Sequence, residues 1–113
     1  MHELSIVMSI IKIAEQQANA ANATVIEEIE LDIGTLSGIE MGALDFAWDQ
    51  AVNQTMLQDS IKKVNRINAK AICMDCNTEF VIEAYYDSCP VCNGHLLDII
   101  QGKELRVKSI LVS

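Results

Sequence analysis

Four cysteines are the residues of this chain best suited to chemistry, because they form two pairs at metal-binding spacing. The pair Cys73-x-x-Cys76 is followed, after twelve residues, by Cys89-Pro-x-Cys92. Each pair lies on a tight turn and offers two thiolates, so two pairs predict four sulfurs that converge tetrahedrally on one metal ion. A closed shell of four thiolates is how proteins hold structural zinc. We therefore predict a zinc site formed by all four cysteines.

Other roles for the cysteines fit less well. Rubredoxin-type iron sites also use Cys-Pro-x-Cys, but they have a longer separation between the pairs and a richer aromatic core. Disulfides need oxidising conditions, and no secretory signal is visible here; a single C-x-x-C also serves thiol redox chemistry. His95 follows Cys92 by three residues. We expect a surface histidine there, and the alternative is that it replaces a thiolate when the pH or the metal state changes.

The start of the chain, Met1-His2-Glu3, offers a second set of donors. The Met1 amine, the His2 imidazole and the deprotonated amides of His2 and Glu3 provide four nitrogens in one plane. Square-planar nitrogen coordination suits Ni(II) or Cu(II), and binding through deprotonated amides weakens as the pH falls. The pattern alone does not separate such a chelate from an ordinary chain start, in which Glu3 favours a helix N-terminus.

The elements that must position these residues follow from periodicity. Apolar and polar residues recur at helical spacing over 4–20 and 40–53, and they alternate over 25–33, which predicts two helices and a half-buried strand with an acidic outer face. A turn is expected at 34–38, an irregular strand at 61–72 and another strand at 105–112. The prediction is a small α+β domain with two helices and a roughly three-stranded sheet, formed by 1–71 and 96–113, into which a zinc-ribbon domain is inserted at 72–95.

Charge and composition exclude several functions. The net charge is −8, and residues 1–61 hold ten acids and one base. The cysteine segment has no Lys or Arg between 71 and 102, and an acidic surface repels nucleic-acid backbones. No apolar run is long enough for a membrane span. We find no nucleophile–base pair, phosphate loop or open zinc site, so an enzyme is not expected.

The whole chain resembles the hydrogenase-maturation nickel metallochaperone family (HypA/HybF type). The matching stretches run nearly from end to end, in the family's order: MHELSIV at 1–7, LDIGTLSGIE at 31–40, LDFAWD at 44–49, the cysteine pairs at 73–92 and ELRVKSILV at 104–112. One departure is the segment NRINAKAIC before the zinc ribbon, which lacks the proline expected there.

This resemblance implies a cytoplasmic metallochaperone that delivers Ni(II) to the large subunit of NiFe-hydrogenase with a nickel-handling GTPase, and that in some organisms also serves urease. It implies a nickel site at Met1, His2 and Glu3 and structural zinc at Cys73, Cys76, Cys89 and Cys92. The strand at 105–112 is expected at a sheet edge, where two copies can pair as a homodimer. The alternative function is a zinc-ribbon adaptor or nucleic-acid-binding module without a nickel role.

Overall fold

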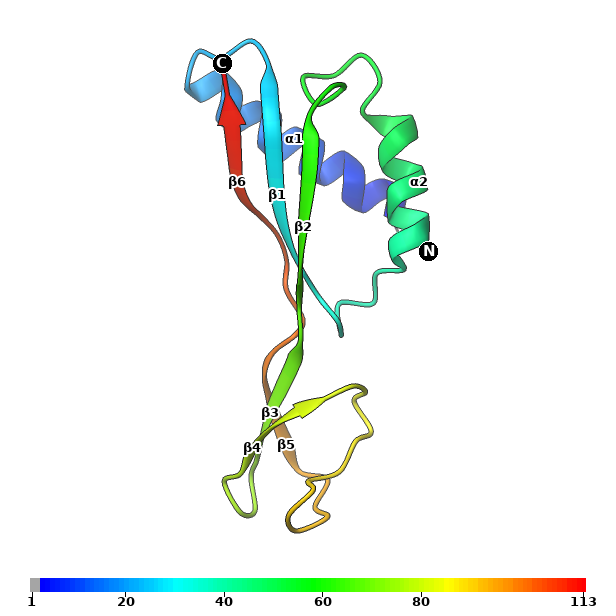
Figure 1. Cartoon of the computed structure of the whole chain (residues 1–113), viewed down its shortest axis with the longest axis vertical. Helices are drawn as coiled ribbons and strands as arrows, with labels where there is room; N and C mark the ends of the chain where they lie inside the picture. Colours follow the sequence, from blue (N-terminus) through cyan, green and yellow to red (C-terminus); the bar gives the residue numbers. More distant parts are fainter. Residues whose placement is uncertain (1–2) are drawn as a thin grey trace. The chain divides into compact units, whose positions relative to one another are not determined.

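The computed structural model describes residues 3–113, and Met1 and His2 lie outside the described residues. It contains two helices and six strands among these residues, which confirms the predicted α+β class. In chain order they are α1 (Glu3–Ala20), β1 (Ile26–Gly34), α2 (Met41–Ala51), β2 (Ile61–Ile67), β3 (Ala69–Cys73), β4 (Glu79–Ile82), β5 (Leu97–Gln101) and β6 (Leu105–Val112) (Figure 1).

The chain packs as two compact units. The helical unit contains residues 3–32, 39–65 and 106–113, and the ribbon unit contains 33–38 and 66–105. The predicted zinc-ribbon segment, 72–95, falls inside the ribbon unit. That the chain divides into independent domains after 71 and before 96 stays a prediction.

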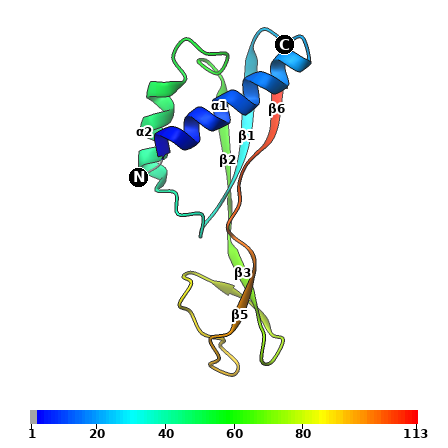
Figure 2. The same ribbon diagram turned by 180° about the vertical axis from the view of Figure 1, so that it is seen from behind.

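The sheet of the helical unit has the strand order β2-β1-β6. Glu28 of β1 pairs with Lys63 of β2, and Asp32 accepts a hydrogen bond from Asn65, so contacts between β1 and β2 advance in the same direction. Contacts between β1 and β6 advance in opposite directions, because Asp32 pairs with Arg106 while Glu30 pairs with Lys108. β1 and β2 are therefore parallel and β6 is antiparallel. α1 crosses one face of this sheet (Figure 2). The paired acids of β1 alternate with the buried Ile29 and Leu31, so the acid–base pairs lie on the other face.

Aliphatic side chains from α1, β1, α2 and the segment between α2 and β2 form the core of the helical unit. The larger fully buried ones are Val7, Ile26, Ile29, Leu31, Leu44 and Leu57. Three apolar residues of the periodic stretches 4–20 and 25–33 lie outside the core: Leu4 and Met8 of α1 and Val25 before β1 are exposed, at 53%, 59% and 39%. The first buried residue of α1 is instead Glu3, at 6% exposure. In the described part of the chain, neither helix has the length and apolar character that crossing a membrane requires.

The predicted irregular strand over 61–72 is two strands that belong to different sheets. β2 ends at Ile67, β3 begins at Ala69, and β3 is the middle strand of a second sheet in the order β4-β3-β5. β3 pairs antiparallel with both neighbours. Sequence periodicity missed β5, because its residues alternate between apolar and polar for only a short length.

Residues 34–38 do more than turn the chain, because they pack within the ribbon unit. Leu36 lies against the small cluster of Ala69, Ala71 and Ile82, and its N–H donates to Gly102 O at 2.7 Å. Gly34 is required at this close approach, since a Cβ there would lie 2.0 Å from Gly102 O.

Candidate metal centre

The structure brings the four cysteine sulfurs together. Their Sγ atoms all lie within 4.8 Å of one another. Cys73 Sγ is 3.5 Å from Cys92 Sγ, and Cys76 Sγ is 3.6 Å from Cys89 Sγ. The first cysteine of each pair is buried and the second is exposed. Each pair therefore contributes one thiol from inside the ribbon unit and one from its surface.

The two cysteine turns have the same backbone hydrogen bonds, which explains how both present two sulfurs. Cys73 N donates to Thr78 O at 2.9 Å, and Cys89 N donates to Gly94 O at 2.8 Å. The residue after each pair closes the turn: Asn77 N donates to Cys73 O at 2.8 Å, and the equivalent bond at Cys89 is 2.9 Å long.

Asn77 and Asn93 both have left-handed backbone conformations, with φ of 62° and 60°. Asparagine tolerates this conformation better than most residues, because its short polar side chain hydrogen-bonds locally. Sequence reasoning missed these two residues. The available signal was the repeat of Asn directly after each pair, in CMDCN and CPVCN.

Gly94 is a further residue of the site that sequence reasoning missed. A Cβ at this position would lie 2.8 Å from Asp75 Oδ2 and 3.2 Å from Cys92 Sγ. A side chain at Gly94 would therefore press on the sulfur cluster, and glycine lets the second turn close against the first.

The electrostatics of the cluster favour the thiolate of Cys76 and oppose that of Cys92. Hydrogen bonds from the Thr78 hydroxyl and from the Thr78 backbone lower the pKa of Cys76 to about 6. At Cys92, a backbone hydrogen bond from Gly94 lowers the pKa, but the neighbouring thiols Cys73 and Cys76 raise it more, to about 12. A divalent cation offsets the repulsion among four thiolates, and a closed sulfur shell is the donor set of structural zinc. The residues present therefore fit a structural zinc ion.

Of the two histidines, His95 lies within the described residues and His2 does not. His95 is exposed, and among the described residues it does not join the cysteines in the metal-binding cluster, as expected for a surface histidine. Met1 and His2 of the predicted nickel site lie outside the described residues. Its third member, Glu3, is buried at the start of α1, and its Oε2 accepts a hydrogen bond from Glu40 N at 3.4 Å.

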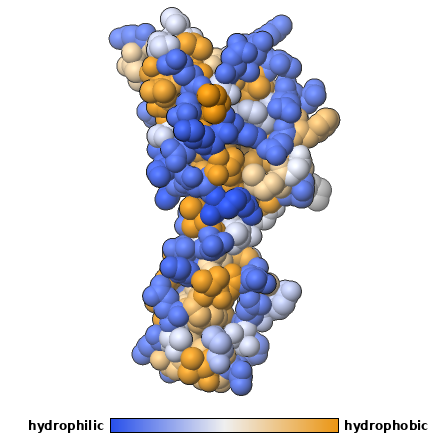
Figure 3. Space-filling model, in the orientation of Figure 1, coloured by the Kyte–Doolittle hydropathy of each residue, from blue (hydrophilic) through white to orange (hydrophobic). Residues whose placement is uncertain are grey.

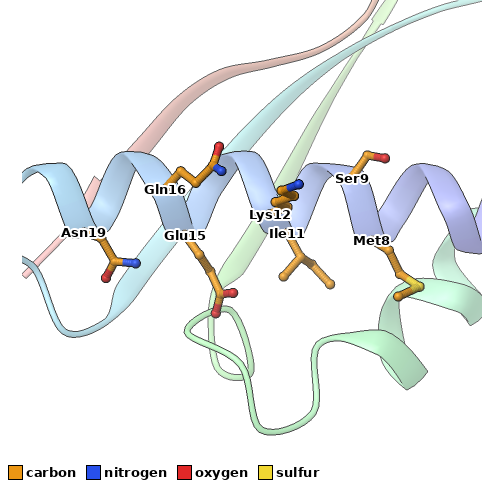
Figure 4. A pocket seen from close by; sticks show the side chains of 7 residues that line it. All are labelled: Met8, Ser9, Ile11, Lys12, Glu15, Gln16 and Asn19. Carbon is orange, nitrogen blue, oxygen red and sulfur yellow. The ribbon is translucent and has the colours of Figure 1, made fainter.

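A hollow of about 530 Å³ along α1 is a different kind of site. It is lined by Met8, Ser9, Ile11, Lys12, Glu15, Gln16 and Asn19 (Figure 4). Its carboxylate is engaged, because Glu15 Oε2 accepts a hydrogen bond from Met56 N at 3.0 Å. The lining contains neither histidine nor cysteine, so it lacks the donors that transition metals prefer.

Comparison with known proteins gives one consistent answer. The profile of the family described as "Hydrogenase/urease nickel incorporation, metallochaperone, hypA" matches residues 1–112. The hydrogenase maturation factor HypA of Parabacteroides distasonis is 45% identical over 99% of this chain and 97% of its own length. That of Geotalea uraniireducens is 38% identical over 99% of both chains.

Solved structures agree with the sequence relatives. The solution structure of the Ni metallochaperone HypA from Helicobacter pylori aligns with a TM-score of 0.70 at 28% identity, over 99% of this chain and 97% of that one. A second HypA solution structure aligns with a TM-score of 0.73 at 28% identity, over 100% and 97% of the two chains. This chain therefore belongs to the HypA family of hydrogenase and urease nickel incorporation metallochaperones.

Proposed function

We propose that this protein binds Ni(II) at its N-terminus and delivers it during maturation of NiFe-hydrogenase in the cytoplasm. The ligands in this proposal are the Met1 amine, the His2 imidazole and the amides of His2 and Glu3. The observation that carries it is the start Met1-His2-Glu3 within a family match that covers residues 1–112. The protein acts as a carrier that holds and releases metal, not as a catalyst.

The surroundings of Glu3 support a chelate at this end of the chain. The Glu3 carboxylate accepts the N–H of Glu40, and Glu40 in turn caps α2 by accepting the N–H of Gly42 at 3.1 Å. Glu3, whose amide is one of the proposed ligands, is therefore held between the starts of two helices.

We assign zinc and nickel to different tasks. In the proposal Cys73, Cys76, Cys89 and Cys92 hold zinc as a resident structural ion, and nickel is cargo. Four thiolates leave no open position for exchange, whereas a chelate at a chain end rearranges with few broken core contacts. Raw affinity in a nitrogen site favours Cu(II) over Ni(II), so selection of nickel depends on metal supply and on partner docking.

The proposed partners are a nickel-handling maturation GTPase and the hydrogenase large subunit, with urease as a second recipient. A homodimer through β6 is a competing use of that strand edge. The competing function is a zinc-ribbon adaptor, with nucleic acid as its target. The ribbon unit contains six acids and three bases, and this balance disfavours phosphate contacts. Salt-dependent DNA or RNA binding at micromolar protein concentration would favour the adaptor.

Replacing one histidine at a time tests the nickel site. We expect His2→Ala to abolish nickel binding while one zinc per chain remains, and His95→Ala, the matched control, to leave both metals unchanged. Equilibrium dialysis followed by metal analysis measures both. Nickel stoichiometry that survives His2→Ala would refute the proposed ligand set.

Extending the chain tests the amine separately. Two residues added before Met1 remove the free amine from the chelate while His2 stays intact. We expect the absorption spectrum of square-planar, diamagnetic nickel to disappear. A spectrum that persists would show that the amine is not a ligand.

A further inference from the structure

One edge of the sheet in the helical unit is open for pairing. β6 is the last strand in the order β2-β1-β6. It runs for eight residues, Leu105–Val112, without proline or glycine. Edge strands present a row of backbone N–H and C=O groups, and proteins usually protect long edges with proline, bulges or a covering element. β6 is therefore an edge strand that is long enough to pair with a further strand.

A hollow of about 290 Å³ borders this strand, lined by Ile13 and Gln17 of α1 and by residues 107–110 of β6. Ile13 is 47% exposed although it is a large apolar side chain. In Figure 2 the C-terminal part of α1 passes in front of β1 and β6. The apolar side chains Ile13, Val107 and Ile110 share this lining with Gln17, Lys108 and Ser109. A strand edge next to a helix, with a partly apolar hollow along the strand, is an arrangement by which proteins bind an extended segment as an added strand.

The neighbour that β6 already has shows which sequence pattern fits it. On one face, Arg106 Nε lies 2.9 Å from Asp32 Oδ2, and Lys108 Nζ lies 3.6 Å from Glu30 Oε2. On the face toward α1, the adjacent β1 residues Ile29 and Leu31 are fully buried. β6 thus pairs with a strand that alternates between acidic and apolar residues.

The exposed basic groups of β6 remain accessible from its open edge. The side chains of Arg106 and Lys108 are 64% and 56% exposed, although each has an acidic partner on β1. A second strand beside β6 would place its outer side chains next to these two bases and its inner side chains in the hollow against Ile13. Opposite charges across neighbouring strands stabilise pairing and like charges oppose it.

We propose that the open edge of β6 and the hollow beside Ile13 bind an extended segment of a partner protein in which apolar and acidic residues alternate. The segment adds a fourth strand to the sheet, with its apolar side chains toward α1 and its acidic side chains beside Arg106 and Lys108. A second copy of this chain is a poorer occupant. Antiparallel pairing of two β6 strands brings the bases of both copies onto neighbouring strands, where they repel.

This surface is separate from the proposed nickel ligands. Ile13 is ten residues after Glu3 along one helix, which corresponds to ~15 Å at the rise of an α-helix. A partner can therefore dock at β6 while the chain start stays accessible for metal transfer.

A peptide titration tests the proposal on the full-length, zinc-loaded protein. The probe is the capped peptide EIELDI, which repeats residues 28–33, and the charge-reversed probe is KIKLKI. We expect EIELDI to shift backbone NMR signals at 13–17 and 105–112 and to slow hydrogen exchange along β6. KIKLKI should bind about tenfold more weakly, because its lysines face Arg106 and Lys108.

Two lysine substitutions on α1 distinguish binding at this site from nonspecific binding. Ile13→Lys places a charge in the hollow and should weaken EIELDI binding about tenfold. Met8→Lys is the control, because Met8 is similarly exposed, at 59%, and lines the hollow of about 530 Å³ on α1. This substitution should leave EIELDI binding unchanged. Both positions are on the surface, and Trp48 fluorescence verifies folding.

Three results would overturn the proposal. One is equal binding by wild type and Ile13→Lys, another is equal binding of the two peptides, and another is signal shifts confined to other elements. Sedimentation of the free protein adds the test of a second copy: a dimer whose β6 amides are protected without peptide would identify that copy as the occupant instead.

Discussion

The helical unit and the ribbon unit bury very different amounts of hydrocarbon. In the helical unit, isoleucine, leucine, valine and Trp48 from α1, β1 and α2 fill a continuous core. In the ribbon unit, the buried cluster consists of Ala69, Ala71 and Ile82, with partly buried side chains around it. Two of the other buried residues there are Cys73 and Cys89. The ribbon therefore places thiols where the helical unit places aliphatic side chains.

Both units leave large apolar side chains exposed, such as Phe46 in the helical unit, but the ribbon unit has fewer residues with which to cover them. Val81, Val91 and Leu96 are 60%, 68% and 62% exposed, and hydrophobic residues reach the surface over this unit on the face drawn in Figure 3. A small unit with few residues cannot cover its apolar groups, and such units commonly depend on a metal for stability. We therefore expect folding of the ribbon unit to depend on zinc, whereas the helical unit is stabilised by its own core.

The aromatic residues allow each unit to be followed separately. The chain has one tryptophan, Trp48, in the helical unit, and two tyrosines, Tyr85 and Tyr86, in the ribbon unit. Trp48 is 4% exposed, so its fluorescence reports the packing of the helical core.

Removing a buried zinc ligand should have the largest effect. We expect Cys73→Ala to lose zinc and to disorder residues 66–105, because metal binding contributes roughly 10–16 kcal/mol to the folding of small zinc domains. Trp48 fluorescence should still report a folded helical unit. Metal analysis and NMR dispersion of the ribbon amides measure the loss. An ordered ribbon without zinc would remove the basis of the comparison.

Truncating the helical core should have the next largest effect. Leu31 is fully buried, so Leu31→Ala should lower the free energy of unfolding by about 2–5 kcal/mol, measured by urea titration of Trp48 fluorescence. Zinc content should stay at one per chain. The control is Leu111→Ala in the same sheet, where the side chain is 55% exposed; a loss there as large as at Leu31 would contradict the assignment of the core.

Acid should weaken the helical unit through Asp32, by less than the core truncation. Hydrogen bonds from Asn65 and then from Arg106 lower the pKa of Asp32 below its ordinary value of 3.8. A lowered pKa stabilises the fold above the ordinary value, and this contribution is lost as the pH falls through the lowered pKa.

We therefore expect Asp32→Asn to reduce the Trp48 melting temperature at neutral pH. The difference from wild type should shrink as the pH falls from 3.8 through the lowered pKa of Asp32, because below that pKa the native carboxyl is protonated as well. Melting curves at a series of pH values measure this. A difference that stays constant across the series would show that the charge of Asp32 is not what stabilises the sheet.

Removing one hydroxyl from the ribbon should have the smallest effect. Tyr85 Oη donates to Leu36 O at 3.0 Å, and the ring is 58% exposed. Tyr85→Phe keeps the ring beside Lys103, whose Nζ lies 5.7 Å from the ring centroid, and removes only this hydrogen bond. We expect a loss of ~0.5–1 kcal/mol in the zinc-loaded ribbon, measured by hydrogen exchange of 34–38. Unfolding of the ribbon unit would instead show that this contact, and not zinc, is the main source of its stability.

Much of the fold was predictable because local signals agreed with the tertiary environment. The helix of α1, the alternation in β1 and the spacing of the cysteines each follow from a short-range pattern. The errors have a common cause. Leu4 and Met8 belong to the apolar stripe of α1, yet they are exposed at 53% and 59%. Periodicity identifies a helix face but not where its partner ends.

The sequence by itself identified the four-cysteine cluster and the family of this protein, because cysteine spacing and the family's motifs are properties of short stretches of the chain. Only the tertiary structure decided that 34–38 packs with the ribbon, that β2 and β3 enter different sheets, and that β6 has an open edge beside Ile13. These features depend on contacts between residues far apart in the chain. Gly34 illustrates the reason: the atom that forbids a side chain there belongs to Gly102, and no local pattern places the two together.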